Sequence, residues 1–193
     1  MKITRCRSWH PALFGAAFAV ALAGCESPVS ENSGTANTYG CGQDGRLEAE
    51  LYGAIRAAIR WQADTLQCEG MPRPAGAGAR LRLSGPLDVD GEPRTLAFII
   101  GIPALERGAI GKELPTNVTL MEEGAGRFFG TQDTSGCWTD VERQDAVGQQ
   151  EPTAYRISGA VYCVSPLAEL NGSSSVSFTE LEFTGRLDWE LPE

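Results

Sequence analysis

Three acidic residues in the second half of the chain have the type and spacing that carboxylate chemistry requires: Glu122, Asp140 and Glu142. Two carboxylates about 5–9 Å apart can hydrolyse a glycosidic bond when burial raises the pKa of one of them. Side chains alternate along a strand, so strands over 117–122 and 137–143 would place all three on one exposed face. The alternative interpretation is a solvated face on which nearby arginines form ordinary cross-strand ion pairs.

Four aromatic residues could supply a binding platform: Trp61, Trp138, Tyr162 and Trp189. Their flat rings could hold a sugar or another hydrophobic ligand, yet they could equally pack in a β-sheet core with each indole N–H meeting a polar partner. We take Trp138 and Trp189, together with the three carboxylates, as a candidate binding face. For most of the four rings, however, the core is the expected location.

The beginning of the chain has the layout of an export signal. Basic residues at positions 2–7 precede an apolar run over 12–22, which is too short to span a bilayer as a helix. The run ends in Leu22-Ala23-Gly24-Cys25. This pattern resembles the lipobox of bacterial lipoproteins, in which the signal is cleaved before a cysteine that carries the lipid.

The resemblance to lipoproteins implies that residues 1–24 are a signal peptide and that Cys25 is the lipidation site, with acyl chains such as palmitate. The resemblance also implies a location in the cell envelope. Asp after the lipidated cysteine retains such proteins in the inner membrane of Gram-negative bacteria, whereas here the residue is Glu26, so we expect a lipid anchor in the outer membrane. Two or three acyl chains anchor a protein stably, whereas one is marginal.

Removal of the signal would narrow the possible chemistry. The only histidine, His10, lies in the signal, as do three of the 16 basic residues and none of the 25 acidic ones. The mature chain would then carry a formal charge of −12 and no histidine. This excludes a Ser-His-Asp triad, a Cys-His pair and a His-ligated metal site, and the charge makes a nucleic-acid partner unfavourable. We therefore expect no enzyme, no metal and no cofactor.

Four cysteines remain after the signal and the lipidated residue are set aside: Cys41, Cys68, Cys137 and Cys163. An even number of cysteines in an exported chain indicates disulfides. The chain has no C-x-x-C pair, which is the spacing that would favour a zinc site. Four cysteines allow three connectivities. We pair them by sequence neighbourhood as Cys41–Cys68 and Cys137–Cys163, the second pair flanking a hairpin.

The remaining pattern predicts two parts, a polar tether over 25–40 and one domain over 41–193. The tether is rich in Ser, Asn, Thr and Gly, and its length gives roughly 20 Å of typical reach. Residues 47–66 are ambiguous, since they show both the alternation of a strand and a helical stripe; we favour strand. Residues 103–117 are expected to form a connection with a short helical turn at most.

Strand patterns and close turn signals then continue to the end of the chain, which predicts an all-β, disulfide-stapled antiparallel sandwich or barrel-like domain. An apolar-x-Gly-x-aliphatic pattern recurs at Gly53, Gly85, Gly159 and Gly185, where glycine predicts a bulge, a bend or a close approach of backbones. A change of parity before Leu181 predicts a bulge near Thr179 or Glu180.

These features predict an acidic, membrane-anchored lipoprotein of the bacterial envelope. Its expected role is a non-catalytic binding or accessory module whose partner is an envelope protein or a glycan. Two alternatives stay open. One is a carrier of a small apolar or lipid-like ligand inside a closed sheet, and the other is a carboxylate-dependent glycan hydrolase.

Overall fold

The first two strands of the described residues form a β-hairpin, which decides between the strand and the helix considered for residues 47–66. The structure is a computed structural model, and it describes residues 40–74, 77–89, 91–148 and 152–190. Strands β1 (Arg46–Gly53) and β2 (Ala57–Gln62) pair antiparallel. Leu47, Ala49 and Leu51 point inward while the residues between them are exposed, so the alternation was the correct signal.

Ten further strands complete the fold, and the described residues contain no helix. They are β3 (Gln67–Pro72), β4 (Ala79–Val89), β5 (Glu92–Ile102), β6 (Gly111–Pro115), β7 (Asn117–Glu123), β8 (Arg127–Gly130), β9 (Cys137–Ala146), β10 (Ala154–Cys163), β11 (Leu167–Glu169) and β12 (Ser175–Asp188). Accordingly, the described part of the chain offers no helix long and apolar enough to cross a membrane.

All pairings are antiparallel, and they join the strands into one bent sheet. The order is β3-β4-β5-β7-β8-β11-β12-β10-β9-β6, with β1 on the other edge of β12 and β2 beyond β1. The strands β3 and β6 at the ends of this order are not paired with each other, so the sheet is not closed into a barrel. The prediction of an all-β, disulfide-stapled antiparallel domain, sandwich or barrel-like, is confirmed.

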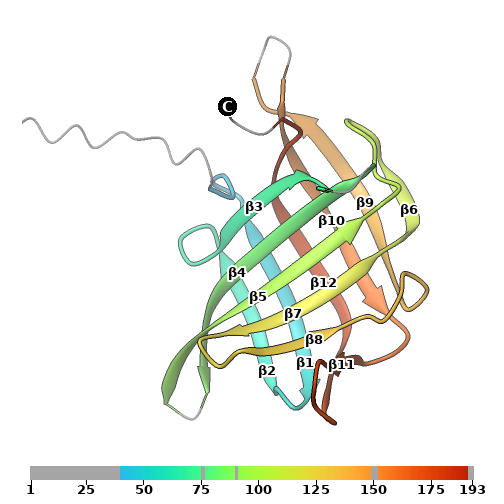
Figure 1. The fold of residues 1–193 in the computed structure, drawn as a ribbon. Helices are drawn as coiled ribbons and strands as arrows, with labels where there is room; N and C mark the ends of the chain where they lie inside the picture. The colour runs from blue at the N-terminus through green and yellow to red at the C-terminus, as the bar shows by residue number, and fades with distance from the viewer. Residues whose placement is uncertain (1–39, 75–76, 90, 149–151, 191–193) are drawn as a thin grey trace, which may run out of the picture. The chain divides into compact units, whose positions relative to one another are not determined.

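The bent sheet forms two layers that face each other across the core. The layer of β3, β4, β5, β7 and β8 lies nearer the viewer in Figure 1, and the layer of β2, β1, β12, β10 and β9 lies behind it. The strand β3 packs against β12, and β2 packs against β4, across the interior. Short β11 connects the two layers between β8 and β12.

Large apolar side chains from both layers fill the space between them. Phe98 of β5 is fully buried and packs edge-to-face on Trp61 of β2 and Phe178 of β12, with ring centroids 6.1 and 6.3 Å apart. The other large side chains with no more than about a hundredth of their surface exposed include Phe129, Phe183, Leu47, Leu81, Leu83, Leu96, Ile100 and Leu120. Burial of such side chains is the main stabilising contribution to a domain of this size.

The recurring glycines mark places where another group comes too close for a side chain. A Cβ on Gly85 would lie 2.5 Å from the Trp61 ring, and one on Gly159 would lie 2.1 Å from the carbonyl oxygen of Asp140. Gly159 also adjoins a register shift between β9 and β10. The predicted bulge in β12 is confirmed as well, because the pairing with β1 steps from Leu181 to Phe178 while β1 advances only from Ala49 to Leu51.

Both disulfides form as paired from the sequence. Cys137 and Cys163 are directly opposite in the β9–β10 register, with Cα atoms 4.1 Å apart. Cys41 and Cys68, with Cα atoms 4.9 Å apart, tie the segment ahead of β1 to β3.

A polar side chain closes the interior beside the loop 106–109. Gln144 of β9 is 7% exposed and makes four hydrogen bonds with its amide group. Its Nε2 donates to the carbonyl oxygens of Glu106 and Ala109, and its Oε1 accepts from the Gly108 amide and the Trp189 indole. One glutamine thus holds the loop 106–109 over the core.

The expectation for residues 103–117 was wrong, because the segment contains the strand β6. This strand is short and irregular: Glu113 has φ 52°, and its pairing with β9 shifts register between Gly111 and Leu114. The segment lacks alternating apolar residues because β6 is an edge strand with an exposed surface. The predicted signal peptide, the predicted lipidation site Cys25 and most of the predicted tether lie outside the described residues.

Candidate ligand-binding face

Two aromatic rings stack on the outside of the back layer. Trp138 of β9 and Tyr162 of β10 are cross-strand neighbours, with ring centroids 5.9 Å apart and planes inclined by 25°. Both are half-buried, whereas the residues beside them in sequence, such as Cys137 and Val161, point into the core. Pro115 of β6 lies opposite Trp138 on its other side. The pair therefore forms a flat apolar platform on the surface.

Carboxylates surround this platform. Asp140 follows Trp138 by two residues on the same face of β9, and its Oδ1 accepts a 2.7 Å hydrogen bond from the backbone N–H of Glu113. Burial raises the pKa of the Tyr162 hydroxyl, and the nearby charges of Asp140 and Glu113 raise this pKa further. The negative potential of these carboxylates therefore reaches the rings.

The acidic side chains continue from the platform across the sheet. In the pairing registers, Asp140 lies opposite Ala160, Ala160 opposite Glu182, and Glu182 opposite Glu48. Where β12 bulges, Glu48, Glu50, Glu180 and Glu182 line a shallow hollow of about 170 Å³ together with Arg60. We call Trp138, Tyr162, Asp140, Glu182 and Glu48 the aromatic–acidic face.

Two of its carboxylates are placed unfavourably for the isolated protein. Glu48 and Glu182 are directly opposite on β1 and β12, and like charges in that position destabilise a sheet. Arg46 lies 3.8 Å from Glu182, and Arg60 lies 3.5 Å from Glu50. Both ion pairs are well exposed, and exposed pairs contribute little. Arg60 also lies directly opposite Glu48 on β2, so each of the two carboxylates has an arginine neighbour that offsets part of the repulsion.

The structure separates Glu122 from the other residues predicted for the site. It was expected on an exposed face, but it points inward from β7 and is only 2% exposed. It forms ion pairs with Arg94 and Arg127, and Arg127 continues to Glu169 at 3.0 Å. The sequence failed here because a buried carboxylate with two arginine partners has the same alternation as an apolar inward residue. In addition, β7 is paired with β5 and β8 rather than with β9.

Trp189 and Trp61 also lie elsewhere. Trp189, just after β12, is half-buried and donates its indole N–H to Gln144 at 2.6 Å. Trp61 is 4% exposed and donates to the carbonyl oxygen of Pro86 at 2.8 Å. Of the four aromatic residues considered, Trp61 alone is fully in the core, so the expectation that most of them would be buried there was wrong.

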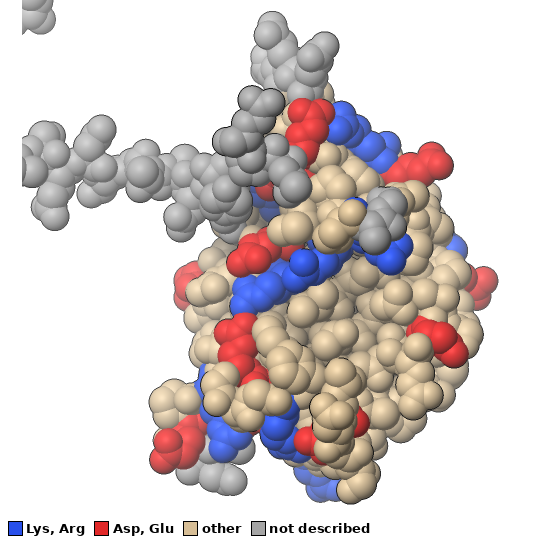
Figure 2. Space-filling view, in the orientation of Figure 1, with Lys and Arg blue, Asp and Glu red and all other residues tan. Residues whose placement is uncertain are grey.

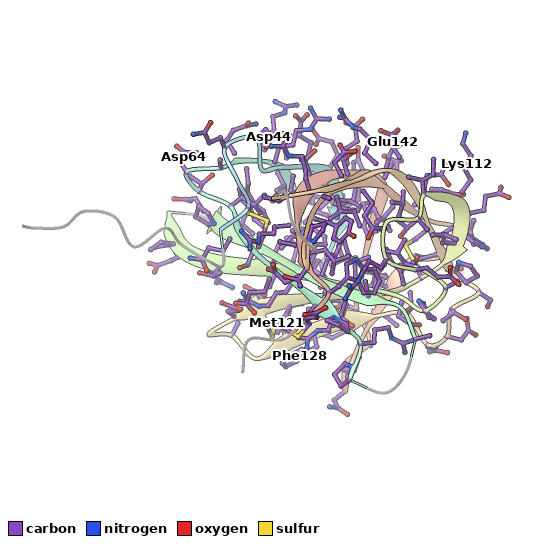
Figure 3. All side chains as sticks on the ribbon, turned by 90° about the horizontal axis from the view of Figure 1, so that it is seen from above. Asp44, Asp64, Lys112, Met121, Phe128 and Glu142 are labelled. Atoms are coloured by element: carbon purple, nitrogen blue, oxygen red, sulfur yellow. A yellow bond between two sulfur atoms is a disulfide. The ribbon has the colours of Figure 1, made fainter. Side chains whose placement is uncertain are left out.

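Glu142 lies on the outside of the back layer, as expected, but beside a register shift. The pairing of β9 with β10 passes from Val141 to Arg143 and leaves Glu142 as the extra residue. Figure 3 shows Glu142 on one side of the domain and Met121 and Phe128 on the other. Asp140 and Trp138 are thus the two predicted residues that the structure brings together with a third partner, Tyr162.

The front layer has a different surface. Figure 2 shows a band of basic and acidic side chains crossing it, beside a broad area with few charges. On this layer, Arg82 of β4 forms ion pairs with Glu69 and Glu123. Phe128 and Met121 are cross-strand neighbours on this layer, with 37% of Phe128 exposed. This surface lacks the combination of stacked rings and carboxylates.

Glu48, Glu182 and Glu113 were not identified from the sequence. The signal for the first two was the alternation in 46–53 and 181–188, which places acidic residues at outward positions of both strands. Only the register of β1 on β12 makes them neighbours, and a pairing of strands more than 120 residues apart is not readable from local pattern. In the described residues no group of three or more His, Cys, Asp or Glu side chains could hold a metal ion.

Comparison with known proteins adds no relative. No protein-family model, no curated protein and no solved structure matches the chain. The arguments about its function therefore depend on the residues described above.

Proposed function

We propose that the chain is a bacterial lipoprotein of the outer membrane whose β-domain is a non-catalytic binding module. The outer-membrane location is supported by the signal-like segment, the lipobox at 22–25 and Glu26. The observation that carries the binding role is the stacked pair Trp138–Tyr162 on the outside of the sheet. Large aromatic side chains that are not needed in the core are frequent at the centres of interfaces.

A lipid anchor would suit such a module. It confines the domain near its partner, and confinement raises the effective concentration so that a modest intrinsic affinity is sufficient. The tether over 25–40 has roughly 20 Å of typical reach, which lets the face turn toward partners in or beside the membrane.

The two alternative functions have less support. A carrier needs an interior volume for its ligand, whereas Phe98, Phe129 and Phe183 fill the space between the layers. A glycan hydrolase needs a carboxyl group with a raised pKa. Hydrogen bonds from Ser135 lower the pKa of Asp133, and those from Ser174 and Arg127 lower the pKa of Glu169. Glu122 is held by arginines inside the domain.

Two experiments test the proposal separately. To test lipidation and the outer-membrane location, cells are labelled with an alkyne analogue of palmitate, and the wild-type chain is compared with Cys25→Ser. The wild type should be labelled and fractionate with the outer membrane, and the variant should lose both. A wild-type chain without label would overturn the lipoprotein assignment.

For the binding role, the tagged chain is crosslinked in intact cells, captured and analysed by mass spectrometry. Trp138→Ala should lose the crosslinked partner, while Phe128→Ala is the matched control, because it removes an exposed ring from the opposite layer. Equal recovery of the partner by wild type and Trp138→Ala would show that the platform is not the binding surface.

A further inference from the structure

The aromatic–acidic face and the hollow beside it carry more carboxylates than arginine neighbours. Asp140, Glu182 and Glu48 follow one another across β9, β12 and β1, and Ala160 between the first two leaves the space above it open. The neighbouring hollow adds Glu50 and Glu180. Two exposed arginines neighbour this row: Arg60 lies directly opposite Glu48 and pairs with Glu50, and Arg46 lies 3.8 Å from Glu182.

The spacing of this row suits an extended chain. Adjacent strands are about 4.8 Å apart, so Glu48 and Glu182 are separated by one strand spacing and Glu182 and Asp140 by about 10 Å. Side chains on one face of an extended peptide repeat every 6.6–6.8 Å or so. The spacing of the carboxylates therefore differs from the side-chain repeat of an extended peptide. Long basic side chains can bridge this difference, because their flexible stems reach over several ångströms.

The rings at the end of the row offer a second contact for the same kind of group. A guanidinium or ammonium group is attracted to the face of Trp or Tyr, and carboxylates beside the ring strengthen the attraction. Asp140 and Glu113 occupy this position next to Tyr162. Arg60 and Arg46 are exposed and offset the repulsion between Glu48 and Glu182 only in part, so a further cation between the two carboxylates would relieve it.

We propose that the aromatic–acidic face binds a basic, extended segment of a protein partner, with Arg or Lys side chains on the row Glu48–Glu182–Asp140 and over the Trp138–Tyr162 platform. This inference rests on the proposed function and specifies the chemistry of the partner. The occupant is a basic peptide rather than a neutral glycan, because a glycan could stack on the rings and hydrogen-bond to the carboxylates but would leave their negative charges uncompensated.

The test uses the purified full chain and three labelled probes: a ten-residue peptide of alternating Arg and Ser, the same peptide with Glu in place of Arg, and a neutral oligosaccharide of N-acetylglucosamine. Binding is followed by fluorescence anisotropy at two salt concentrations. The basic peptide should bind, and a rise in salt from 50 to 200 mM should weaken it severalfold. Equal or tighter binding of the acidic peptide or of the oligosaccharide would overturn the inference.

Variants then locate the site. Asp140→Asn and Glu48→Gln should each weaken the basic peptide about threefold to tenfold, and Trp138→Ala about tenfold or more, which corresponds to 1.4 kcal/mol per factor of ten. Asp64→Asn is the matched control, since it removes one exposed charge at the β2–β3 turn, outside the face. The two charge variants are surface changes that leave the core intact, so they remain informative even if Trp138→Ala unfolds.

The results distinguish this inference from the proposed function. If Asp140→Asn and Glu48→Gln bound the basic peptide as tightly as Asp64→Asn, the inference would be wrong. Loss of a crosslinked partner with Trp138→Ala in cells would still uphold the binding module in that case. The palmitate label on Cys25 tests the lipid anchor independently of the binding role and of the basic-peptide inference.

Discussion

Replacement of Gln144 by leucine should destabilise the domain by about 3 kcal/mol, although leucine has nearly the same volume. The side chain is 7% exposed and bonds to three backbone groups of the loop 106–109 and to the Trp189 indole. A buried donor or acceptor without a partner costs about 1–3 kcal/mol. Water can reach the loop from outside and replaces some of the lost hydrogen bonds. We therefore count two partner groups as unsatisfied, which gives about 3 kcal/mol.

The expected change is large enough to measure. For a domain of this size, 1 kcal/mol corresponds to about 2–4 °C in Tm, so Gln144→Leu should lower Tm by about 6–12 °C. Urea unfolding should show a lower midpoint with an unchanged slope. Hydrogen exchange at the Gly108 amide should become faster, because that N–H loses its 2.9 Å bond to Gln144.

The control is Gln67→Leu, which changes an exposed glutamine at the start of β3. A surface change of this kind usually shifts stability by less than about 0.5 kcal/mol. If Gln144→Leu were as stable as Gln67→Leu, or if the Gly108 amide kept its protection, the argument that one amide group holds the loop would be refuted.

Three further outcomes are expected. Glu122→Ala should cost about 3 kcal/mol in urea unfolding, because it removes the ion-pair partner of Arg94 and one of the two ion-pair partners of Arg127, whereas Glu142→Ala should cost less than about 0.5 kcal/mol; equal losses would contradict the buried ion pairs. The pKa of Glu169 is lowered from 4.5 by Ser174 and Arg127, so its contribution to stability is present above that pH and is lost as the pH falls below it. Glu169→Gln should therefore flatten the fall in unfolding free energy between pH 6 and 3, and an unchanged slope would reject this contribution. Reduction of either disulfide should lower the unfolding free energy by about 3.5 kcal/mol, as expected for loops of 26 or 27 residues on the chain-entropy model; an unchanged Tm in reductant would reject it.

The sequence predicted the elements of the fold better than their arrangement. Alternation identified β1 and β12, and the parity change before Leu181 located the bulge, because each of these signals is local. The strand β6 was missed, since its side chains are mostly exposed and carry no alternation. Which strands become neighbours depends on how the sheet bends at β11, and no local pattern encodes that bend.

The candidate site was predicted in part for the same reason. Trp138 and Asp140 belong to one strand, so their common face could be predicted from alternation. Glu122 has the same alternation on β7, but the sequence does not say which side of that strand is the interior when an inward position holds a charge. The pairing of Glu48 with Glu182 depends on contact between the first and the last strand.

The position of the first disulfide has a mechanical consequence. Gly40 forms an isolated bridge with Gln67, and Cys41 is bonded to Cys68. A pull on the chain ahead of Gly40 therefore enters the domain at β3, and the covalent bond carries the load past β1 and β2. At β3 the load acts on the pairing with β4, in which six residue pairs are in register. The hydrogen bonds of this pairing must be strained together before β3 can slide. Without the disulfide, the same pull would act on β1 and could detach it from β12 one pair at a time. The Cys41–Cys68 bond thus decides which strand resists when the domain is held from its N-terminal side.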